Sequence, residues 1–210
     1  MVIVAIVGPD SCGKTTQAKM LVDRLGNGGY KAVYVQPIFI LLNILTRSRD
    51  NDVALISPRK TRTSEMSESN NHGKRYLTKK LFMSLLGYPY ALITYIFMKF
   101  YLSRNKIVVC DRYFYQFFFD LFGDFGKKII RIFPRPDITF FLDGDLDLFY
   151  SRMNDSFDAS VGRTYYTEVL NLYRRISQKY GFIHVNANHN KEAINDIIFM
   201  HLTKEIRGVL

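Results

Sequence analysis

The stretch Gly8-Pro9-Asp10-Ser11-Cys12-Gly13-Lys14-Thr15-Thr16 decides the fold, because it fits the phosphate-loop pattern G-x-x-x-x-G-K-[ST]. Residues 2–7 before it are continuously apolar, as in a buried strand, and residues 17–25 after it place apolar side chains at helical spacing. A strand, a glycine-containing loop and a helix in this order are the context that the pattern requires. The sequence therefore predicts a phosphate-binding loop rather than a chance match in a turn.

Each residue type in this loop has a chemical reason. Gly8 and Gly13 let backbone N–H groups approach a phosphate chain, and the helix that begins near Lys14 points its positive end at the same place. We expect Lys14 to reach the β- and γ-phosphates of ATP and the Thr15 hydroxyl to bind Mg²⁺. The predicted ATP site comprises the whole loop: Gly8, Pro9, Asp10, Ser11, Cys12, Gly13, Lys14, Thr15 and Thr16.

Length, charge and cysteine usage set the broad class of the protein. A chain of 210 residues is expected to form one domain, 1–210, with a substantial core. Its formal charge of +10 suits anionic nucleotides but also nucleic acid or an anionic membrane, which charge alone does not distinguish. Cys12 and Cys110 make no disulfide framework, and the chain begins directly with strand residues, so we expect a cytoplasmic protein without a signal peptide.

Strand and helix patterns alternate along the chain. Strands are predicted at residues 2–7, 30–36, 106–110, 137–142 and 182–185, and helices at 17–25, 38–45, 145–153, 165–180 and 191–206. This alternation predicts an α/β fold with a doubly wound, five-stranded parallel sheet and helices on both faces. The ligand of such a sheet lies beyond the carboxyl ends of the strands, where the loop at 8–16 would fall.

Two segments interrupt this pattern. Residues 46–75 are polar with little periodicity and predict a long loop, whose basic residues either hold a substrate anion or are simply solvated. Residues 81–98 carry no charge, and an uncharged stretch of this length raises the question of a membrane span. A span would separate Lys14 from the later acidic site, so we expect a buried or dimer-forming helical pair broken near Pro89. The upstream basic residues keep contact with a membrane surface as the less favoured alternative.

The strand at 106–110 leads into Asp111-Arg112-Tyr113. An acidic residue at a strand end in a phosphate-loop protein commonly holds Mg²⁺, so Asp111 is the second predicted metal ligand. Arg112 is expected to bind the acceptor phosphate, since a guanidinium offers paired hydrogen bonds, and a structural ion pair is the alternative. The aromatic residues that follow are predicted to be mostly core: Phe114, Tyr115, Phe117, Phe118 and Phe119.

With these residues in place, most of the chain resembles the thymidylate kinase family of nucleoside monophosphate kinases. The resemblance rests on the phosphate loop followed by Gln17, on Cys110-Asp111-Arg112-Tyr113, and on Arg135-Pro136-Asp137-Ile138-Thr139-Phe140-Phe141-Leu142-Asp143 followed by Arg152. It implies a P-loop kinase core with a small lid, usually dimeric, which transfers the γ-phosphoryl group of ATP to a deoxynucleoside monophosphate. In this resemblance Asp10 matches an acid near the acceptor sugar, and Arg112 matches the acceptor-phosphate arginine.

Members of this family place a catalytic arginine either in the phosphate loop or in a mobile lid. Ser11 occupies the loop position, so the resemblance assigns that arginine to the lid, at about 153–164. Arg152 and Arg163 flank this segment and are the candidates, although Arg163 would also suit a structural ion pair on the next helix. The predicted catalytic set is Lys14, Asp10, Arg112, Arg152 and Arg163.

The acceptor side departs from the family pattern. Ile38 follows Pro37 where the family carries an arginine, Tyr90 stands at the position of a base-reading arginine, and Gln116 replaces a serine. Losing a hydrogen bond built for a substrate group costs several orders of magnitude in discrimination. The acceptor is then either not thymidylate or is read by other residues, and the predicted acceptor set is Asp10, Arg112, Tyr113, Tyr90 and Gln116.

Together these features favour an enzyme with Mg²⁺ as cofactor and ATP as donor, which converts dTMP to dTDP, forms a homodimer and binds no nucleic acid. A kinase of another small-molecule acceptor is the nearest alternative. A nucleotide-dependent switch protein with slow turnover is the alternative from a different class. The arginines around the lid favour an enzyme, whereas the uncharged stretch 81–98 and the altered acceptor side support the alternatives.

Overall fold

The computed structural model describes residues 2–40, 86–152 and 162–209. The chain forms two compact units. The first, which we call the sheet unit, comprises Met1–Val35, Lys99–Arg112 and Pro136–Leu210, and the second, the helical unit, comprises Gln36–Met98 and Tyr113–Arg135. The long loop predicted at 46–75 lies outside the described residues, as does most of the helix predicted at 38–45.

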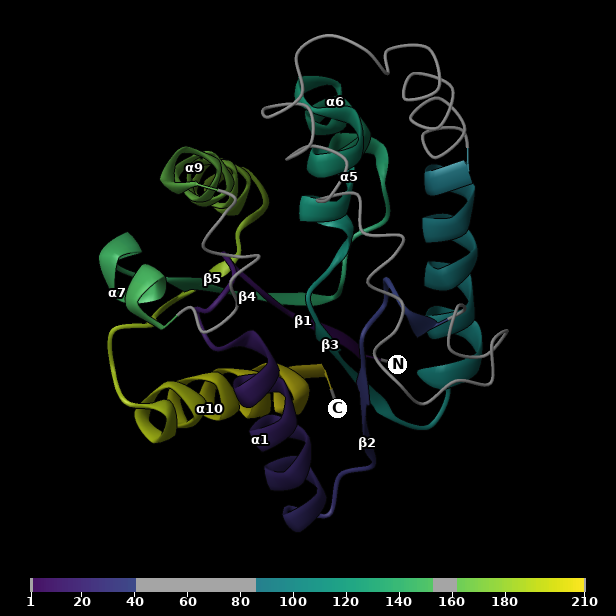
Figure 1. Ribbon diagram of the computed structural model, residues 1–210. Helices are drawn as coiled ribbons and strands as arrows, with labels where there is room; N and C mark the ends of the chain where they lie inside the picture. The colour runs from purple at the N-terminus through teal and green to yellow at the C-terminus, as the bar shows by residue number, and fades with distance from the viewer. Residues whose placement is uncertain (1, 41–85, 153–161, 210) are drawn as a thin grey trace, which may run out of the picture. The chain divides into compact units, whose positions relative to one another are not determined.

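The sheet unit is built on five parallel strands in the order β2-β3-β1-β4-β5 (Figure 1). The strands are β1 (Val2–Val7), β2 (Ala32–Val35), β3 (Ile107–Asp111), β4 (Ile138–Asp143) and β5 (Ile183–Asn186). In the central strand every residue after Val2 is buried, because helices cover both faces of a parallel sheet. The predicted doubly wound sheet is therefore confirmed, with strand boundaries within two residues of those expected.

Helices α1 (Lys14–Asn27) and α10 (Lys191–Val209) pack on one face of the sheet, and α9 (Arg163–Tyr180) packs on the other (Figure 1). Val4 and Ile6 of β1 join Leu21 of α1 and Ile198 of α10 in one apolar cluster. On the opposite face, Phe141 of β4 stacks on Tyr173 of α9, with ring centroids 5.7 Å apart.

A buried polar contact ties α1 to α10. The Asn195 amide donates to the backbone oxygen of Gln17 at 3.3 Å and to its side-chain Oε1 at 3.1 Å. The Gln17 amide in turn donates to the Lys191 carbonyl at 2.9 Å, and both side chains are buried. The first turn after the phosphate loop is thus anchored to the beginning of the last helix.

The strand register brings the functional loop and the Asp-Arg motif together. Ile6 of β1 lies opposite Asp111 of β3, and Val7 lies opposite Phe141 of β4. Because the strands are parallel, the loop that leaves β1 and the residues that leave β3 meet at the same edge of the sheet. This is the position that the sequence predicted for the ligand.

Two predicted boundaries around the lid need adjustment. Helix α7 spans Leu146–Ser151, and Arg152 ends it rather than lying inside a helix that continues to 153. Helix α9 begins at Arg163, two residues before the predicted start. Arg163 therefore belongs to a helix, and residues 153–161 of the predicted lid lie outside the described residues.

The helical unit contains a helix at residues 86–97, α5 (Phe114–Phe122) and α6 (Asp124–Ile132). A π-helical turn, Met98–Leu102, continues the first of these along the chain. Gly126 lets α6 approach α5, since a Cβ there would lie 2.2 Å from the Phe118 carbonyl oxygen. The aromatic side chains predicted to be core are buried, and Phe118 and Phe133 meet edge to face with centroids 4.9 Å apart.

The predicted break at Pro89 is wrong, because helix 86–97 runs through this residue without interruption. A proline costs a helix one hydrogen bond and crowds the preceding turn, and the packing of buried residues such as Ala91 outweighs this cost here. None of the helices in the described ranges is both long and apolar enough to cross a bilayer.

Candidate functional site

The phosphate loop has a backbone that ordinary residues rarely adopt. Gly8 has φ 151° and Gly13 has φ 96°, and Ser11 between them has φ 64°. A side chain at Gly8 would collide with the loop itself, since a Cβ there would lie 2.8 Å from Cys12 Sγ and 2.9 Å from the Leu142 carbonyl oxygen. These angles form the tight loop that directs backbone N–H groups toward an anion.

Helix α1 begins immediately after this loop. No side chain caps its N-terminus, and its first turn holds no acidic residue. Its free N–H groups and the positive end of its dipole are therefore not neutralised by the helix's own side chains. This arrangement suits a phosphate group.

The Lys14 side chain is folded back into the loop. It is only 3% exposed, its ammonium donates to the Pro9 carbonyl oxygen, and it lies 3.7 Å from Asp10 Oδ1. A buried ammonium requires such partners, because its desolvation is otherwise costly. A phosphate arriving at the loop offers the same ammonium a stronger, doubly charged acceptor.

Asp111 is the centre of a hydrogen-bond cluster on three elements. Its Oδ2 accepts a hydrogen bond from the Thr15 hydroxyl at 2.6 Å and another from the Tyr34 hydroxyl at 2.7 Å. Thr15 comes from α1, Tyr34 from β2 and Asp111 from the end of β3. Asp111 is only 1% exposed, so the carboxylate is held in one environment by these two donors.

The Thr15 hydroxyl and the Asp111 carboxylate form a donor set that fits Mg²⁺. Both are hard oxygen ligands, they are adjacent, and they lie beside the phosphate loop. Within the described ranges no group of three or more His, Cys, Asp or Glu side chains is arranged to hold a metal ion. A pair of protein oxygens is nevertheless typical of Mg²⁺ sites in which substrate phosphates supply the remaining ligands.

Arg112 follows directly, with φ 71° and a backbone N–H that donates to the Ile6 carbonyl oxygen at 3.1 Å. Its guanidinium donates to Asp10 Oδ1 at 3.1 Å and lies 3.7 Å from Asp111 Oδ1. Burial lowers the pKa of Arg112, but Asp10 and Asp111 outweigh this effect, so its pKa is raised above the ordinary value. Because 33% of the side chain is exposed, this permanent cation is accessible to an anionic ligand.

Both thiols are buried within this framework. Burial raises the pKa of Cys12, against a smaller opposing effect of Lys14. Burial also raises the pKa of Cys110, and the charge of Asp111 adds to this effect. Neither residue forms a disulfide.

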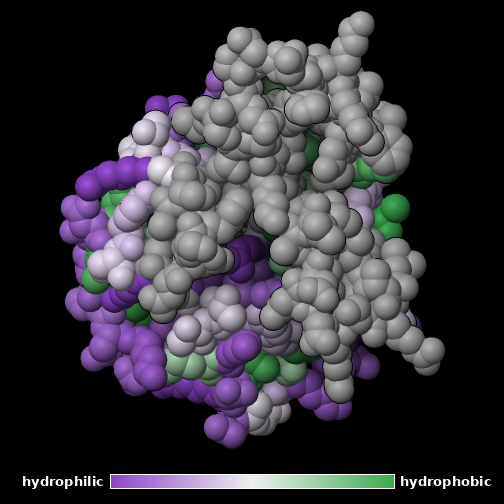
Figure 2. All heavy atoms as spheres, in the orientation of Figure 1, coloured by the Kyte–Doolittle hydropathy of each residue, from purple (hydrophilic) through white to green (hydrophobic). Residues whose placement is uncertain are grey.

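The two candidate lid arginines are exposed and lie at helix ends. Arg163 opens α9 and pairs with Asp147 of α7 at 2.5 Å, while Arg152 caps the C-terminus of α7. The surface over α7 and α9 is mostly hydrophilic (Figure 2). The alternative that Arg163 forms an ion pair is thus realised, and its catalytic role stays a prediction.

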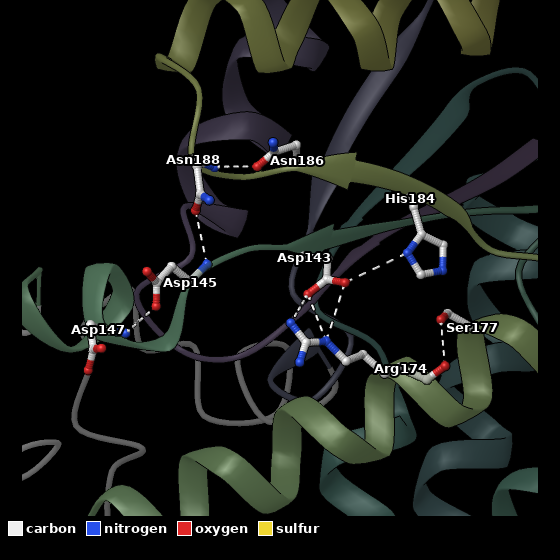
Figure 3. Close-up of polar contacts among 8 residues, drawn as sticks. All are labelled: Asp143, Asp145, Asp147, Arg174, Ser177, His184, Asn186 and Asn188. Atoms are coloured by element: carbon white, nitrogen blue, oxygen red, sulfur yellow. Dashed lines mark hydrogen bonds and ion pairs between the residues drawn. The ribbon is translucent and has the colours of Figure 1, made fainter.

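Polar residues also gather where β4 and β5 end (Figure 3). Arg174 of α9 donates to Asp143 from Nε at 3.1 Å and from Nη2 at 2.9 Å, and His184 Nδ1 lies 3.9 Å from the same carboxylate. Asn188 accepts a hydrogen bond from the Asp145 backbone N–H at 2.9 Å. These contacts fix the turns after β4 and β5, at the same edge of the sheet as the phosphate loop.

Of the predicted acceptor residues, Asp10 and Arg112 lie in the sheet unit, while Tyr90, Tyr113 and Gln116 lie in the helical unit. The Tyr90 hydroxyl donates to the Ile38 carbonyl oxygen at 2.6 Å. Tyr113 is completely buried and donates to the Pro134 carbonyl oxygen at 2.8 Å, and Gln116 is also buried. Their contact with an acceptor stays a prediction.

Tyr34 is the site residue that the sequence did not reveal. It was expected only as part of a strand, and its hydroxyl reaches a carboxylate 77 positions away in the chain. The available signal was strand order: a tyrosine near the end of β2 lies close to the end of β3 if the two strands are neighbours. The structure shows that β2 and β3 are neighbours in the sheet.

Comparison with solved structures identifies a protein of similar fold. No model of a protein family matches the chain, and no curated protein matches it. Among solved structures it is similar to a deoxyadenosine kinase from M. mycoides, with a TM-score of 0.55 and 12% sequence identity over 96% of this chain and 98% of that chain. That structure contains the products dCMP and a flexible dCDP. At this identity the likeness shows a P-loop kinase fold.

Proposed function

We propose that this protein is an ATP-dependent, Mg²⁺-requiring kinase that transfers a phosphoryl group to a nucleoside monophosphate, with thymidylate as the acceptor. The observation that carries the proposal is the convergence of the phosphate loop, the Thr15–Asp111 pair and Arg112 at the ends of β1 and β3. Phosphoryl transfer asks the protein for positioning and charge stabilisation rather than covalent chemistry. These residues supply both.

In this proposal the loop and Lys14 hold the donor phosphates. Arrival of the γ-phosphate draws the Lys14 ammonium away from the Pro9 carbonyl and Asp10. Thr15 and Asp111 would hold Mg²⁺, which neutralises phosphate charge when bound. Asp111 reaches this role already oriented, since two hydroxyl groups donate to it.

Arg112 is proposed to bind the acceptor phosphate. Its raised pKa keeps it charged at every working pH, and its contact with Asp10 holds the guanidinium at the loop. Asp10 would then orient the acceptor sugar, as the family resemblance implies. Asp10 belongs to the loop that holds the donor, and Arg112 contacts Asp10, which favours a short path for the transferred group.

Arg163 is proposed to neutralise the transferring phosphoryl group. A cation in the first turn of a helix is unfavourable, because the helix dipole is positive there. The exposed ion pair with Asp147 offsets little of this cost. An arginine at the end of the predicted lid is what the proposed role requires.

A deoxynucleoside is the second candidate acceptor. It is favoured by the likeness to a deoxyadenosine kinase and by the absence, from the sequence, of the family's second acceptor arginine after Pro37. An acceptor without a phosphate needs fewer arginines. The two acceptor classes are distinguished by direct assay.

The test is ADP formation by the purified protein with ATP and Mg²⁺, against thymidylate, the other nucleoside monophosphates and the deoxynucleosides. We expect turnover with thymidylate at about 1 to 100 per second. Lys14→Ala should abolish it, whereas Lys204→Ala, an exposed lysine on α10, should leave it unchanged. Turnover with deoxynucleosides alone would establish the second candidate. ATP binding without turnover on any acceptor would instead favour a nucleotide-dependent switch.

We also propose a homodimer that forms through helix 86–97. Its exposed residues are Leu86, Pro89, Ile93 and Ile96, which we call the apolar stripe. Their spacing of three, four and three residues is that of a coiled-coil seam. Residues 81–98 carry no charge, so a second copy packed symmetrically on this helix meets no like charge. Two buried cysteines that form no disulfide suit the reducing cytoplasm in which we place the protein.

A further inference from the structure

We infer that Tyr34 is a positioning residue that orients Asp111 for Mg²⁺, an inference that rests on the proposed function. Tyr34 lies on β2, outside the phosphate loop and outside the Asp-Arg motif. It touches neither donor nor acceptor in this role and acts only through the carboxylate. Its contribution is therefore to metal affinity rather than to chemistry.

The strand geometry explains why Tyr34 reaches this carboxylate. Tyr34 pairs in register with Val109 of β3, and Asp111 lies two residues further along the same strand. Residues two apart on a strand share a face, so Val109 and Asp111 point to the side of the sheet that α1 covers. Tyr34 packs against the same apolar cluster, which leaves its hydroxyl directed at the end of β3.

The hydroxyl contributes something that Thr15 alone does not. One carboxylate oxygen accepts both hydrogen bonds, from two elements that hold it between them. On the other side, Arg112 Nη1 lies 3.7 Å from Asp111 Oδ1 and attracts the carboxylate. Removing the Tyr34 hydroxyl takes away one of the two described hydrogen bonds that hold Oδ2 against this attraction, so the carboxylate turns more easily toward Arg112.

The Tyr34 ring also contacts α1. The Lys19 ammonium of α1 lies 5.8 Å from the ring centroid, within the range of a cation–π contact. The same helix therefore supplies Thr15 to Asp111 and holds the ring that supplies the second hydroxyl. Removing a group that hydrogen-bonds to a metal ligand typically lowers metal affinity by roughly 10- to 100-fold.

The test is the affinity for ATP, measured by calorimetry without metal and over a range of Mg²⁺ concentrations. Tyr34→Phe keeps the ring and removes only the hydroxyl. We expect ATP affinity without metal to be unchanged and the Mg²⁺ concentration that gives half of the metal-dependent gain to rise about tenfold or more. Tyr30→Phe is the matched control, because it removes a phenolic hydroxyl from a half-buried tyrosine that precedes β2. This variant should behave as the wild type.

A double-mutant cycle separates positioning from a general structural effect. In an Asp111→Asn background, Tyr34→Phe should add no further change to the Mg²⁺ requirement, because its target is gone. An unchanged Mg²⁺ requirement in Tyr34→Phe, or an equal effect in both backgrounds, would overturn the role of Tyr34 alone. A wild-type protein whose ATP affinity does not respond to Mg²⁺ would overturn the proposed function together with this inference.

Discussion

Gly8 stands where β1 ends and the phosphate loop begins, and nothing larger fits there. Its φ of 151° is open to glycine but strained for other residues, and a Cβ would press on Cys12 Sγ and the Leu142 carbonyl oxygen. We expect Gly8→Ala to lower the free energy of unfolding by about 2 kcal/mol or more, through backbone strain and displaced atoms. ATP binding should be lost as well. Chemical denaturation and calorimetry measure the two effects.

Gly26 provides the matched control for this substitution. It lies inside α1 without a positive φ, and a Cβ there would meet nothing within 4 Å. Gly26→Ala should therefore raise stability by up to about 1 kcal/mol, since alanine favours a helix over glycine. If Gly8→Ala retained both stability and ATP affinity, the constraint that we assign to this position would be wrong.

Arg163 tests the assignment of the transition-state cation. Removing an arginine that stabilises the transferring phosphoryl group lowers turnover by roughly 10³-fold or more. We expect Arg163→Ala to lose activity on this scale while its thermal unfolding and ATP affinity stay near those of the wild type, because its ion pair with Asp147 is exposed. Arg175→Ala, an exposed arginine on the same helix, should retain activity. Near-normal turnover in Arg163→Ala would exclude the role.

The residues of the site differ in how visible they were in the sequence. Lys14, Thr15 and the glycines were predictable because one local loop must hold them at fixed spacing. Asp111 required the further argument that carboxyl ends of parallel strands converge. Tyr34 was not predictable, because its hydrogen bond requires β2 to lie beside β3. The sequence alone does not show that these two strands are neighbours in the sheet.

At the scale of elements, the anchoring of α1 on α10 is the contact most open to test. Asn195 is buried and donates twice to Gln17. Asn195→Ala leaves the Gln17 acceptors buried without this donor, which should lower the free energy of unfolding by about 1 to 3 kcal/mol. Weaker ATP binding should follow, because Gln17 lies in the first turn after the loop.

Asn171→Ala controls for the loss of an asparagine from a helix. This residue is exposed on α9, so its replacement should change stability by no more than about 0.5 kcal/mol. Equal stability of the Asn195 and Asn171 variants would show that the buried amide contributes nothing. Denaturant titrations followed by circular dichroism measure both.

The elements themselves were predicted well where their pattern was strong. The five strands follow from continuous apolar runs, which helices on both faces of a parallel sheet require. The break near Pro89 was predicted from residue type alone, and it failed because packing of the helix outweighs the cost of the proline. The early start of α9 was missed because Arg163 carries no capping signal: Gly162 precedes it, without a side-chain cap.

At the scale of the whole molecule, the apolar stripe predicts the oligomeric state. Leu86, Ile93 and Ile96 are between 46% and 56% exposed, which is costly for a helix that has buried residues such as Ala91 on its other side. Ile93→Asp should convert a dimer to a monomer in analytical ultracentrifugation, because symmetry places two carboxylates in one interface. Met200→Asp, at an exposed methionine of α10, should leave the dimer intact. A monomeric wild type would rule out this interface.

The tie between α1 and α10 also bears on how the protein is made. The phosphate loop is synthesised well before the groups that hold its helix, the Lys191 carbonyl and the Asn195 amide. A nascent chain that ends before α10 has the loop sequence but lacks the support of its helix. Nucleotide binding should therefore appear only after α10 has been synthesised.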